Sequence, residues 1–272
     1  MRKSVYYGMG IFCLFTSAII LLNTNILPFN IANNISQVRY DSGYKDYYHI
    51  GFPMPRNSLR QGTVYLPVYS ARDSEQLLEI MTPFGMADVD IVENADEYFF
   101  ETTMDGQTLR IYRYIDLLEY ENLRSGRADR LIDENMARQA ADDFLEKFLP
   151  CKRPYSVTVQ RDNDGWAVIF AGRLSGLENR AFPTEIILDV YGNILGASHY
   201  FFDYEALGSA DVITVRAALA QLPREQGYRV HLKGYELVYM FEESVLVPVY
   251  RFYGKCAGGV DFEEFVGALR FY

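Results

Sequence analysis

The chain has 272 residues, of which 49% are hydrophobic and 15% aromatic, so it can bury a substantial core and is not globally disordered. Its formal net charge is −10, with 36 acidic against 26 basic side chains. An acidic body of this kind repels phosphate backbones, and we therefore expect no nucleic-acid partner. Tyrosine (22) and phenylalanine (18) are frequent, which favours β-sheet.

The N-terminus contains a candidate membrane segment. Arg2 and Lys3 precede an apolar run, and no charged side chain occurs between Lys3 and Arg39. A bilayer core about 30 Å thick needs about 20 largely apolar residues in a helix, and uncharged flanks bring the run to that length. The two basic residues predict a cytoplasmic N-terminus, an extracytoplasmic body and a single pass through the cell membrane. The expected transmembrane residues are Val5, Tyr6, Tyr7, Gly8, Met9, Gly10, Ile11, Phe12, Cys13, Leu14, Phe15, Thr16, Ser17, Ala18, Ile19, Ile20, Leu21 and Leu22.

Cleavage as a signal peptide is the alternative to a permanent signal anchor. A cleavage site needs two small residues in spaced positions, and Leu21, Leu22 and Asn23 provide none. The only later candidate lies near Ala32. The pattern therefore favours an uncleaved anchor, with residues 1–27 as cytoplasmic stub and transmembrane segment.

Residues 28–60 are expected to form a stem. They are rich in asparagine, and Pro53 and Pro55 interrupt regular structure. The stem also holds an aromatic group that is a candidate partner surface, because tyrosine is enriched at protein interfaces. Packing of these rings against the body is the alternative. The group consists of Tyr44, Tyr47, Tyr48 and Phe52.

Residues 61–128 are expected to form a first α+β unit. A helix starts near Ser74 and ends at Pro83 and Gly85. Strands are predicted over 89–95, 97–104 and 109–121, and Asp105-Gly106 predicts a hairpin. The helix residues expected to face inward are Leu77, Leu78 and Met81.

Residues 129–207 are expected to form a second α+β unit. Asp133 is the predicted N-cap of its helix, and Pro150 ends that helix. Strands 155–160 and 166–173 flank a turn at 162–165, and strands 184–190 and 194–204 flank a turn at 191–193. The expected inward stripe is Met136, Ala140, Phe144 and Phe148, with Ala137, Ala141 and Leu145 beside it.

Residues 208–272 are expected to form a third unit. Thr214 is the predicted cap of a helix that ends at Pro223, and strands follow over 230–243, 245–255 and 262–272. Pro248 predicts that its strand lies at a sheet edge or contains a bulge. The expected fold class is α+β, with an N-terminal transmembrane helix followed by repeated helix-plus-antiparallel-sheet units.

The C-terminal half resembles known extracytoplasmic proteins. The single anchor, the helix from Thr214, the strand VPVYRFYGK and the closing strand FVGALRFY resemble the YycH/YycI type. The segment TEIILDVYGNILGASH is similar to the strand-turn-strand ending of a PepSY-like module, with an Asp-x-x-Gly turn from Asp189 to Gly192. The resemblance covers residues 130–272 and the anchor. It implies PepSY-like units and a protein that regulates a sensor histidine kinase of a two-component system by contact.

Motifs that carry chemistry are absent from the sequence. His49, His199 and His231 lie in unrelated contexts, and there is no HExxH, CxxC, P-loop or GxSxG pattern. We therefore expect no catalytic residues, no cofactor and no metal. Whether Cys151 and Cys256 form a disulfide stays open. Adjacent acidic pairs such as Asp142 with Asp143, and Glu263 with Glu264, are expected on a solvated surface, and Trp166 in the core.

Composition, anchor and resemblance together predict a membrane-anchored, extracytoplasmic regulatory protein that is not an enzyme. The expected partner is another membrane protein, such as a sensor histidine kinase, and the oligomeric state stays open. Two alternatives remain. One is an anchored cell-envelope hydrolase with an unrecognised site, and the other is a PepSY-like inhibitory or ligand-binding module.

Overall fold

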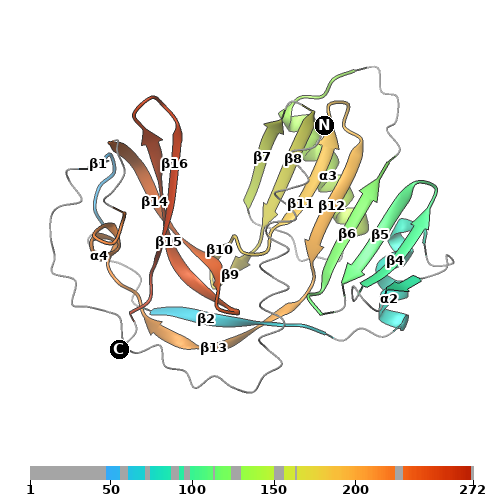
Figure 1. Ribbon diagram of the computed structural model, residues 1–272, viewed down its shortest axis with the longest axis horizontal. Helices are drawn as coiled ribbons and strands as arrows, with labels where there is room; N and C mark the ends of the chain where they lie inside the picture. Colours follow the sequence, from blue (N-terminus) through green and yellow to red (C-terminus); the bar gives the residue numbers. More distant parts are fainter. Residues whose placement is uncertain are drawn as a thin grey trace. The chain divides into compact units, whose positions relative to one another are not determined.

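Two eight-stranded β-sheets make up most of the described chain (Figure 1). The computed structural model describes residues 47–55, 61–70, 74–86, 92–94, 99–112, 114–123, 130–149, 156–162, 164–223 and 229–270. All of them belong to one compact unit within residues 40–271. We name the two sheets the helix-covered sheet and the hairpin sheet.

The helix-covered sheet is antiparallel, in the order β3-β4-β5-β6-β12-β11-β8-β7. At its centre β6 pairs with β12, where Tyr120 lies opposite Ala197. This pairing joins two separate stretches of chain into one sheet. The strands are β3 (Val92–Asn94), β4 (Phe99–Met104), β5 (Gln107–Tyr112), β6 (Leu117–Asn122), β7 (Ser156–Asp162), β8 (Gly165–Ala171), β11 (Thr184–Asp189) and β12 (Ile194–Tyr200).

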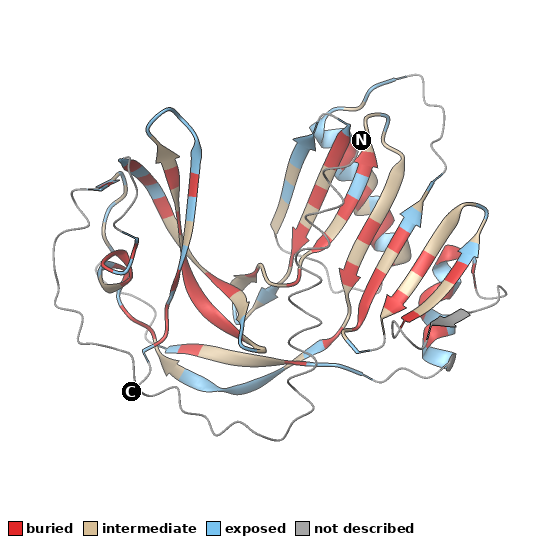
Figure 2. Ribbon diagram, viewed as in Figure 1, coloured by how far each residue is buried: buried red, intermediate tan, exposed pale blue. Residues whose placement is uncertain are grey.

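Helices α2 (Ser74–Met81) and α3 (Glu134–Phe148) lie on one face of this sheet (Figure 1). Alternate side chains of the strands point at the helices, so buried and partly exposed positions alternate along β8 and β11 (Figure 2). Val168 and Ile186 are fully buried and share a core with Phe144 of α3. Burial of each such side chain contributes about 1.5–3 kcal/mol.

The helix start predicted at Asp133 is confirmed, but the inward stripe is only partly correct. The Asp133 carboxylate accepts a hydrogen bond from the Met136 N–H at 2.9 Å. Met136 of α3 and Leu78 of α2 are exposed. The buried face of α2 consists of Leu77, Ile80 and Met81. The buried residues of α3 are Ala137, Ala141, Phe144 and Leu145.

The hairpin sheet has the order β13-β2-β15-β14-β10-β9, with β1 beside β14 and β16 beside β15. The short helix α4 (Val215–Leu219) packs into its core, and the predicted cap Thr214 accepts a hydrogen bond from the Ala217 N–H. The strands are β1 (Tyr48–Ile50), β2 (Gln61–Val68), β9 (Arg173–Leu174), β10 (Leu177–Asn179), β13 (Asp203–Asp211), β14 (Val230–Glu242), β15 (Val245–Cys256) and β16 (Asp261–Gly267).

The long hairpin of β14 and β15 changes its neighbours along its length. Near the open end it lies between β1 and β16, and near its turn it lies between β10 and β2. Pro248 falls between Leu246, which pairs with β2, and Val249, where pairing with β16 begins. β15 is thus an interior strand, and the prediction of an edge strand at Pro248 is wrong. The proline is tolerated where the strand exchanges one partner for the next.

Three turns predicted from the sequence are present. Asp105 and Gly106 both have positive φ and join β4 to β5. Asp162 pairs with Gly165 at the β7–β8 hairpin. Between β11 and β12, the Asp189 carboxylate accepts hydrogen bonds from the backbone N–H groups of Tyr191 and Asn193 at 2.8 and 2.9 Å.

The expected fold class is wrong, because the described chain is not a series of repeated helix-plus-antiparallel-sheet units. Strands dominate the described chain, and its three α-helices have 8, 15 and 5 residues. Strands of the expected first and second units merge through the β6–β12 pairing. β2, expected in the first unit, and β13 pair with each other in the hairpin sheet. Exposed strand edges are unfavourable, which explains why the expected units share sheets instead of standing apart.

Within the described residues no helix is long and apolar enough to cross a membrane. The expected segment Val5–Leu22 lies outside the described residues.

Candidate interaction face

The aromatic group of the stem does not form one surface. Tyr44 lies outside the described residues. Tyr47 is exposed, whereas Tyr48 is only 2% exposed and its hydroxyl donates a hydrogen bond to the Pro223 carbonyl at 2.6 Å. Phe52 is half-buried against Tyr235. For Tyr48 and Phe52 the structure therefore agrees with the alternative, in which the rings pack against the body.

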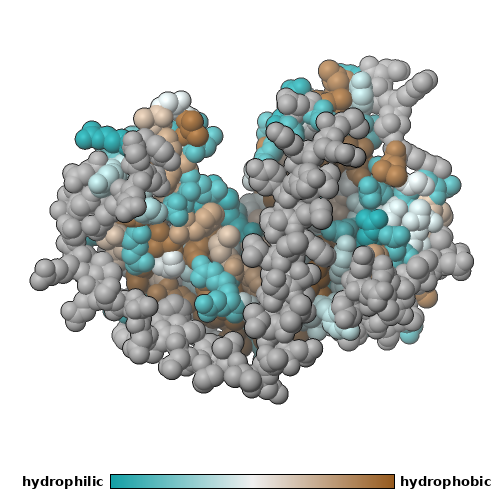
Figure 3. Space-filling view, in the orientation of Figure 1, coloured by the Kyte–Doolittle hydropathy of each residue, from teal (hydrophilic) through white to brown (hydrophobic). Residues whose placement is uncertain are grey.

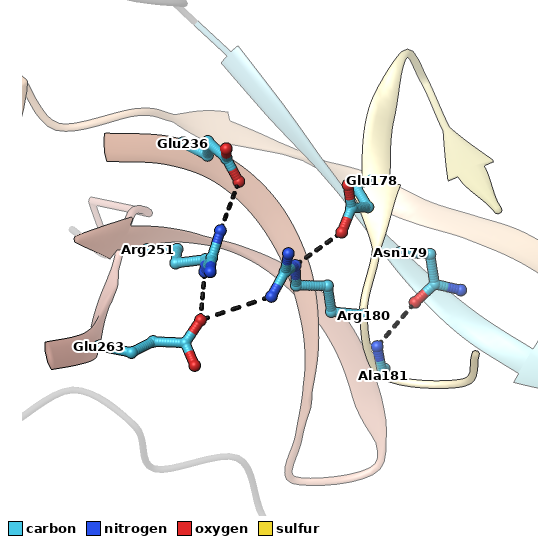
Figure 4. Close-up of polar contacts among 7 residues, drawn as sticks. All are labelled: Glu178, Asn179, Arg180, Ala181, Glu236, Arg251 and Glu263. Carbon is cyan, nitrogen blue, oxygen red and sulfur yellow. Dashed lines mark hydrogen bonds and ion pairs between the residues drawn. The ribbon is translucent and has the colours of Figure 1, made fainter. Parts of the chain in front are cut away.

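A group of charged side chains on the outer face of the hairpin sheet forms a candidate interaction face. Alternation along β15 places Arg251 on the side opposite the buried Phe252 and Tyr250. Its guanidinium lies between the carboxylates of Glu236 on β14 and Glu263 on β16 (Figure 4). Nη1 lies 2.9 Å from a Glu236 oxygen, and Nε donates to Glu263.

Arg180 extends this group from the end of β10. Its backbone N–H bonds to the Tyr239 carbonyl of β14, which fixes its position beside the sheet. Its guanidinium contacts Glu178 at 2.6 Å and Glu263 at 3.4 Å (Figure 4). We name the five side chains the arginine–glutamate cluster. It consists of Glu178, Arg180, Glu236, Arg251 and Glu263, and carries a net charge of −1 (two arginines against three glutamates).

Aromatic side chains adjoin the cluster. The Arg251 guanidinium lies 5.0 Å from the ring centre of Tyr253, and Arg251 pairs across the strands with Phe265 of β16. Phe265 is 36% exposed, and Val260 in the preceding turn is 66% exposed. Hydrophobic and hydrophilic side chains gather side by side over the β14–β16 region (Figure 3). Arginine and aromatic side chains in this mixture are typical of protein interfaces.

The electrostatics keep Arg251 charged. Partial burial by itself lowers the pKa of Arg251, but hydrogen bonds and charges from Glu263 and Glu236 outweigh it, so the net shift is upward. The side chain of Arg251 is 19% exposed, while those of its two glutamates are 43% exposed. The cluster therefore offers outward carboxylates held in fixed positions by a partly buried cation.

The acidic pairs that the structure describes on α3 and at the end of β14 lie in different surroundings. On α3, Asp142 lies near Arg138 and Asp143 accepts a hydrogen bond from Gln139. At the end of β14, burial and then the charge of Glu243 raise the pKa of Glu242. The described residues also contain no group of three or more metal-ligating side chains.

The remaining candidate residues have mixed outcomes. Trp166 is buried in the core of the helix-covered sheet, as predicted. His199 is buried, and its ring contacts the Thr184 hydroxyl at 2.8 Å. Cys256 is half-buried at the end of β15, and Cys151 lies outside the described residues. His49 and His231, which the sequence placed in unrelated contexts, lie side by side.

The cluster was missed because its members come from four strands, namely the end of β10, β14, β15 and β16. Only the alternation of VLVPVYRFYGK, which separates Arg251 from Phe252, indicated an outward position for the arginine. The partners of Arg251 depend on how β15 pairs with β14 and β16. The register of that pairing cannot be recognised in a single sequence.

No protein-family model matches the chain, and no curated protein matches it. Several solved structures are similar to part of this chain, including the following two. One is an uncharacterized protein from Eubacterium rectale ATCC 33656, with 11% identity over 78% of this chain and 84% of that chain, and a TM-score of 0.44. The other is the Bacillus megaterium YpeB C-terminal domain, with 14% identity over 73% of this chain and 94% of that chain, and a TM-score of 0.47. At TM-scores below 0.5 no function follows from either likeness.

Proposed function

We propose that this chain is a membrane-anchored, extracytoplasmic regulatory protein that acts by protein–protein contact, with a sensor histidine kinase of a two-component system as its partner. One observation carries the contact: the arginine–glutamate cluster with Phe265 exposed beside it. The apolar run from Val5 to Leu22 supports the anchor, and the resemblance to the YycH/YycI type supports the partner class.

The chemistry of the cluster suits recognition better than catalysis. Arg251 and Arg180 engage all three carboxylates, so these acids are held as ion-pair partners. A partner with a basic group and an apolar pocket would complement the outward carboxylates and the Phe265 ring. Regulation would follow from differential affinity, because a ligand shifts its partner only toward the state that it binds more tightly.

A second candidate function is that of a PepSY-like inhibitory or ligand-binding module. The observation in its favour is the strand-turn-strand of β11 and β12, whose turn is closed by hydrogen bonds to the Asp189 carboxylate. On this alternative the helix-covered sheet would contact the partner, and the cluster would be only structural.

Quantitative co-purification from membranes distinguishes these proposals. The full chain, the variant Phe265→Ala and the matched control Leu131→Ala are recovered under the same conditions. Leu131 is also exposed, but it lies beside the helix-covered sheet, just before α3. We expect a membrane protein to be recovered with wild type and with the control, and to be depleted with Phe265→Ala. Equal recovery with all three would contradict the proposed face, and a partner other than a kinase would contradict the proposed class.

A further inference from the structure

The two exposed histidines of the hairpin sheet meet across a parallel strand pair. His49 lies on β1 and His231 on β14, 182 positions apart in the sequence, and they are directly opposite in register. Their rings are stacked at 17°, with centres 4.7 Å apart. The two Nδ1 atoms are 2.7 Å apart and share a hydrogen bond, so the proton between them must leave before both nitrogens can bind one ion.

We propose that His49 and His231 form a binding site for a borderline divalent transition-metal ion of the Cu²⁺, Ni²⁺ or Zn²⁺ class. Imidazole nitrogen is a preferred ligand for these ions, at about 2.0–2.1 Å for zinc. Two nitrogens bound to one ion in neighbouring positions are roughly 3 Å apart at these bond lengths. The observed separation therefore needs to widen by only a few tenths of an ångström, and water completes the coordination.

Gly51 leaves room for the His231 ring beside His49. A Cβ atom at Gly51 would lie 2.8 Å from Nε2 of His231, so the ring occupies space that only glycine leaves open. The Gly51 N–H bonds to the Leu232 carbonyl at 2.8 Å, which continues the β1–β14 contact past the histidines. The strand register therefore brings the two imidazoles together, and the glycine leaves space for the His231 ring.

Positive charges near the histidine pair partly oppose the binding of a cation. Lys255 lies opposite His231 on β15, and Lys233 follows His231 on β14. Lys255 is engaged by Asp261 at 2.9 Å, and the hydrogen bond and charge of Lys255, with the charge of Lys233, lower the pKa of Asp261. The imidazoles must therefore supply the affinity, and removal of Lys255 should not weaken binding.

Metal binding at this pair would connect the stem to the body. β1 has three residues and follows directly on the chain that leads from the N-terminal apolar run. An ion bound to both histidines would tie β1 to β14 and slow its detachment. This inference does not depend on which partner the arginine–glutamate cluster contacts.

Titration of the untagged, metal-free full chain with Cu²⁺ and Zn²⁺ tests the proposal. We expect one saturable site, lost in both His49→Gln and His231→Gln and retained in Lys255→Gln. The electron paramagnetic resonance spectrum of the Cu²⁺ form should show hyperfine coupling to two nitrogens. Zn²⁺ should also slow amide hydrogen exchange at residues 48–50 in wild type.

Three outcomes would overturn the proposal. They are the absence of binding, binding that survives in both glutamine variants, and a copper spectrum without two nitrogen ligands. Thermal unfolding of the variants without metal checks that they are folded. If no metal binds to folded protein, the two rings share only their hydrogen bond, and the metal site is refuted.

Discussion

Ala268 donates its backbone N–H to the carbonyl oxygen of Pro248 at 3.2 Å, and proline has no N–H to return the bond. In an ordinary antiparallel pair of this kind the two residues exchange both bonds. Here the Ala268 carbonyl accepts the Ile213 N–H at 2.8 Å. The chain entering α4 thus replaces the donor that Pro248 lacks, which explains how an interior strand accommodates a proline.

The same proline restricts residue 62 of β2. A Cβ atom at Gly62 would lie 2.7 Å from Cγ of Pro248. We expect Gly62→Ala to lower the free energy of unfolding by about 2 kcal/mol through overpacking. In a Pro248→Ala background the loss should be about 1 kcal/mol smaller, because the ring is gone. A double-mutant cycle by urea unfolding measures this coupling. A coupling energy near zero would show that contacts with Leu269 and Val212, the other close neighbours, and not with Pro248 destabilise Gly62→Ala.

The turn between β14 and β15 is strained. Glu243 and Ser244 both have positive φ (47° and 75°), a conformation that favours asparagine and glycine. The double replacement Glu243→Asn with Ser244→Gly should raise the free energy of unfolding by about 1 kcal/mol. Asp105→Asn, in a turn that already contains Gly106, is the matched control and should change stability by less than about 0.5 kcal/mol. Lower stability of the double variant would contradict the assigned turn geometry.

The arginine–glutamate cluster should make a small contribution to the free energy of unfolding, and this contribution should depend on salt concentration. Arg251→Gln leaves Glu236 and Glu263 without their shared cation, and we expect a loss of about 1 kcal/mol at low ionic strength. The loss should shrink in 0.5 M salt because exposed charges are screened. Arg138→Gln, which removes a single exposed contact on α3, is the control and should cost less than about 0.5 kcal/mol. Urea unfolding at both salt concentrations measures the difference, and a salt-independent loss would indicate packing instead of charge.

Buried tyrosines predict loss of stability at alkaline pH. Burial, followed by neighbouring tyrosines, raises the pKa of Tyr239 and Tyr250 to about 12. Their hydroxyls donate to the carbonyls of Thr63 and Ile213, which the ionised form cannot do. In the unfolded chain these groups ionise near pH 10. Their contribution is therefore complete below pH 10 and is lost as the pH rises from about 10 to about 12.

Urea unfolding at pH 9, 10 and 11 checks this dependence. Stability should fall across the series, and it should fall less steeply in Tyr250→Phe. Tyr191→Phe, at an exposed tyrosine, should keep the wild-type dependence. An unchanged slope in Tyr250→Phe would contradict the role of the buried hydroxyl.

Local features of the fold could be predicted from the sequence. Asp133 and Thr214 cap their helices, and Asp105-Gly106 forms its hairpin, because capping and tight turns depend on a few consecutive residues. Trp166 is in the core, as its strand context indicated.

Pairing between strands that are distant in the sequence could not be predicted from local sequence patterns. β13 is largely polar and exposed, and β2 contains Gly62 and Pro67, so neither has the alternating pattern of a strand. Their pairing with each other merges segments that were expected to belong to different units. The cluster around Arg251 and the His49–His231 pair depend on the same kind of register, and they became visible only with the sheet in place.

Site-specific photo-crosslinking in intact cells tests whether the β14–β16 face contacts a partner protein. A photoreactive amino acid replaces Phe265 in one variant of the full chain and Leu131 in another, and adducts are identified after illumination. We expect a discrete adduct with one membrane protein from position 265, weakened by Arg251→Gln and absent from position 131. No adduct from position 265, or the same adduct from both positions, would contradict the claim that this chain works by contact through the β14–β16 face.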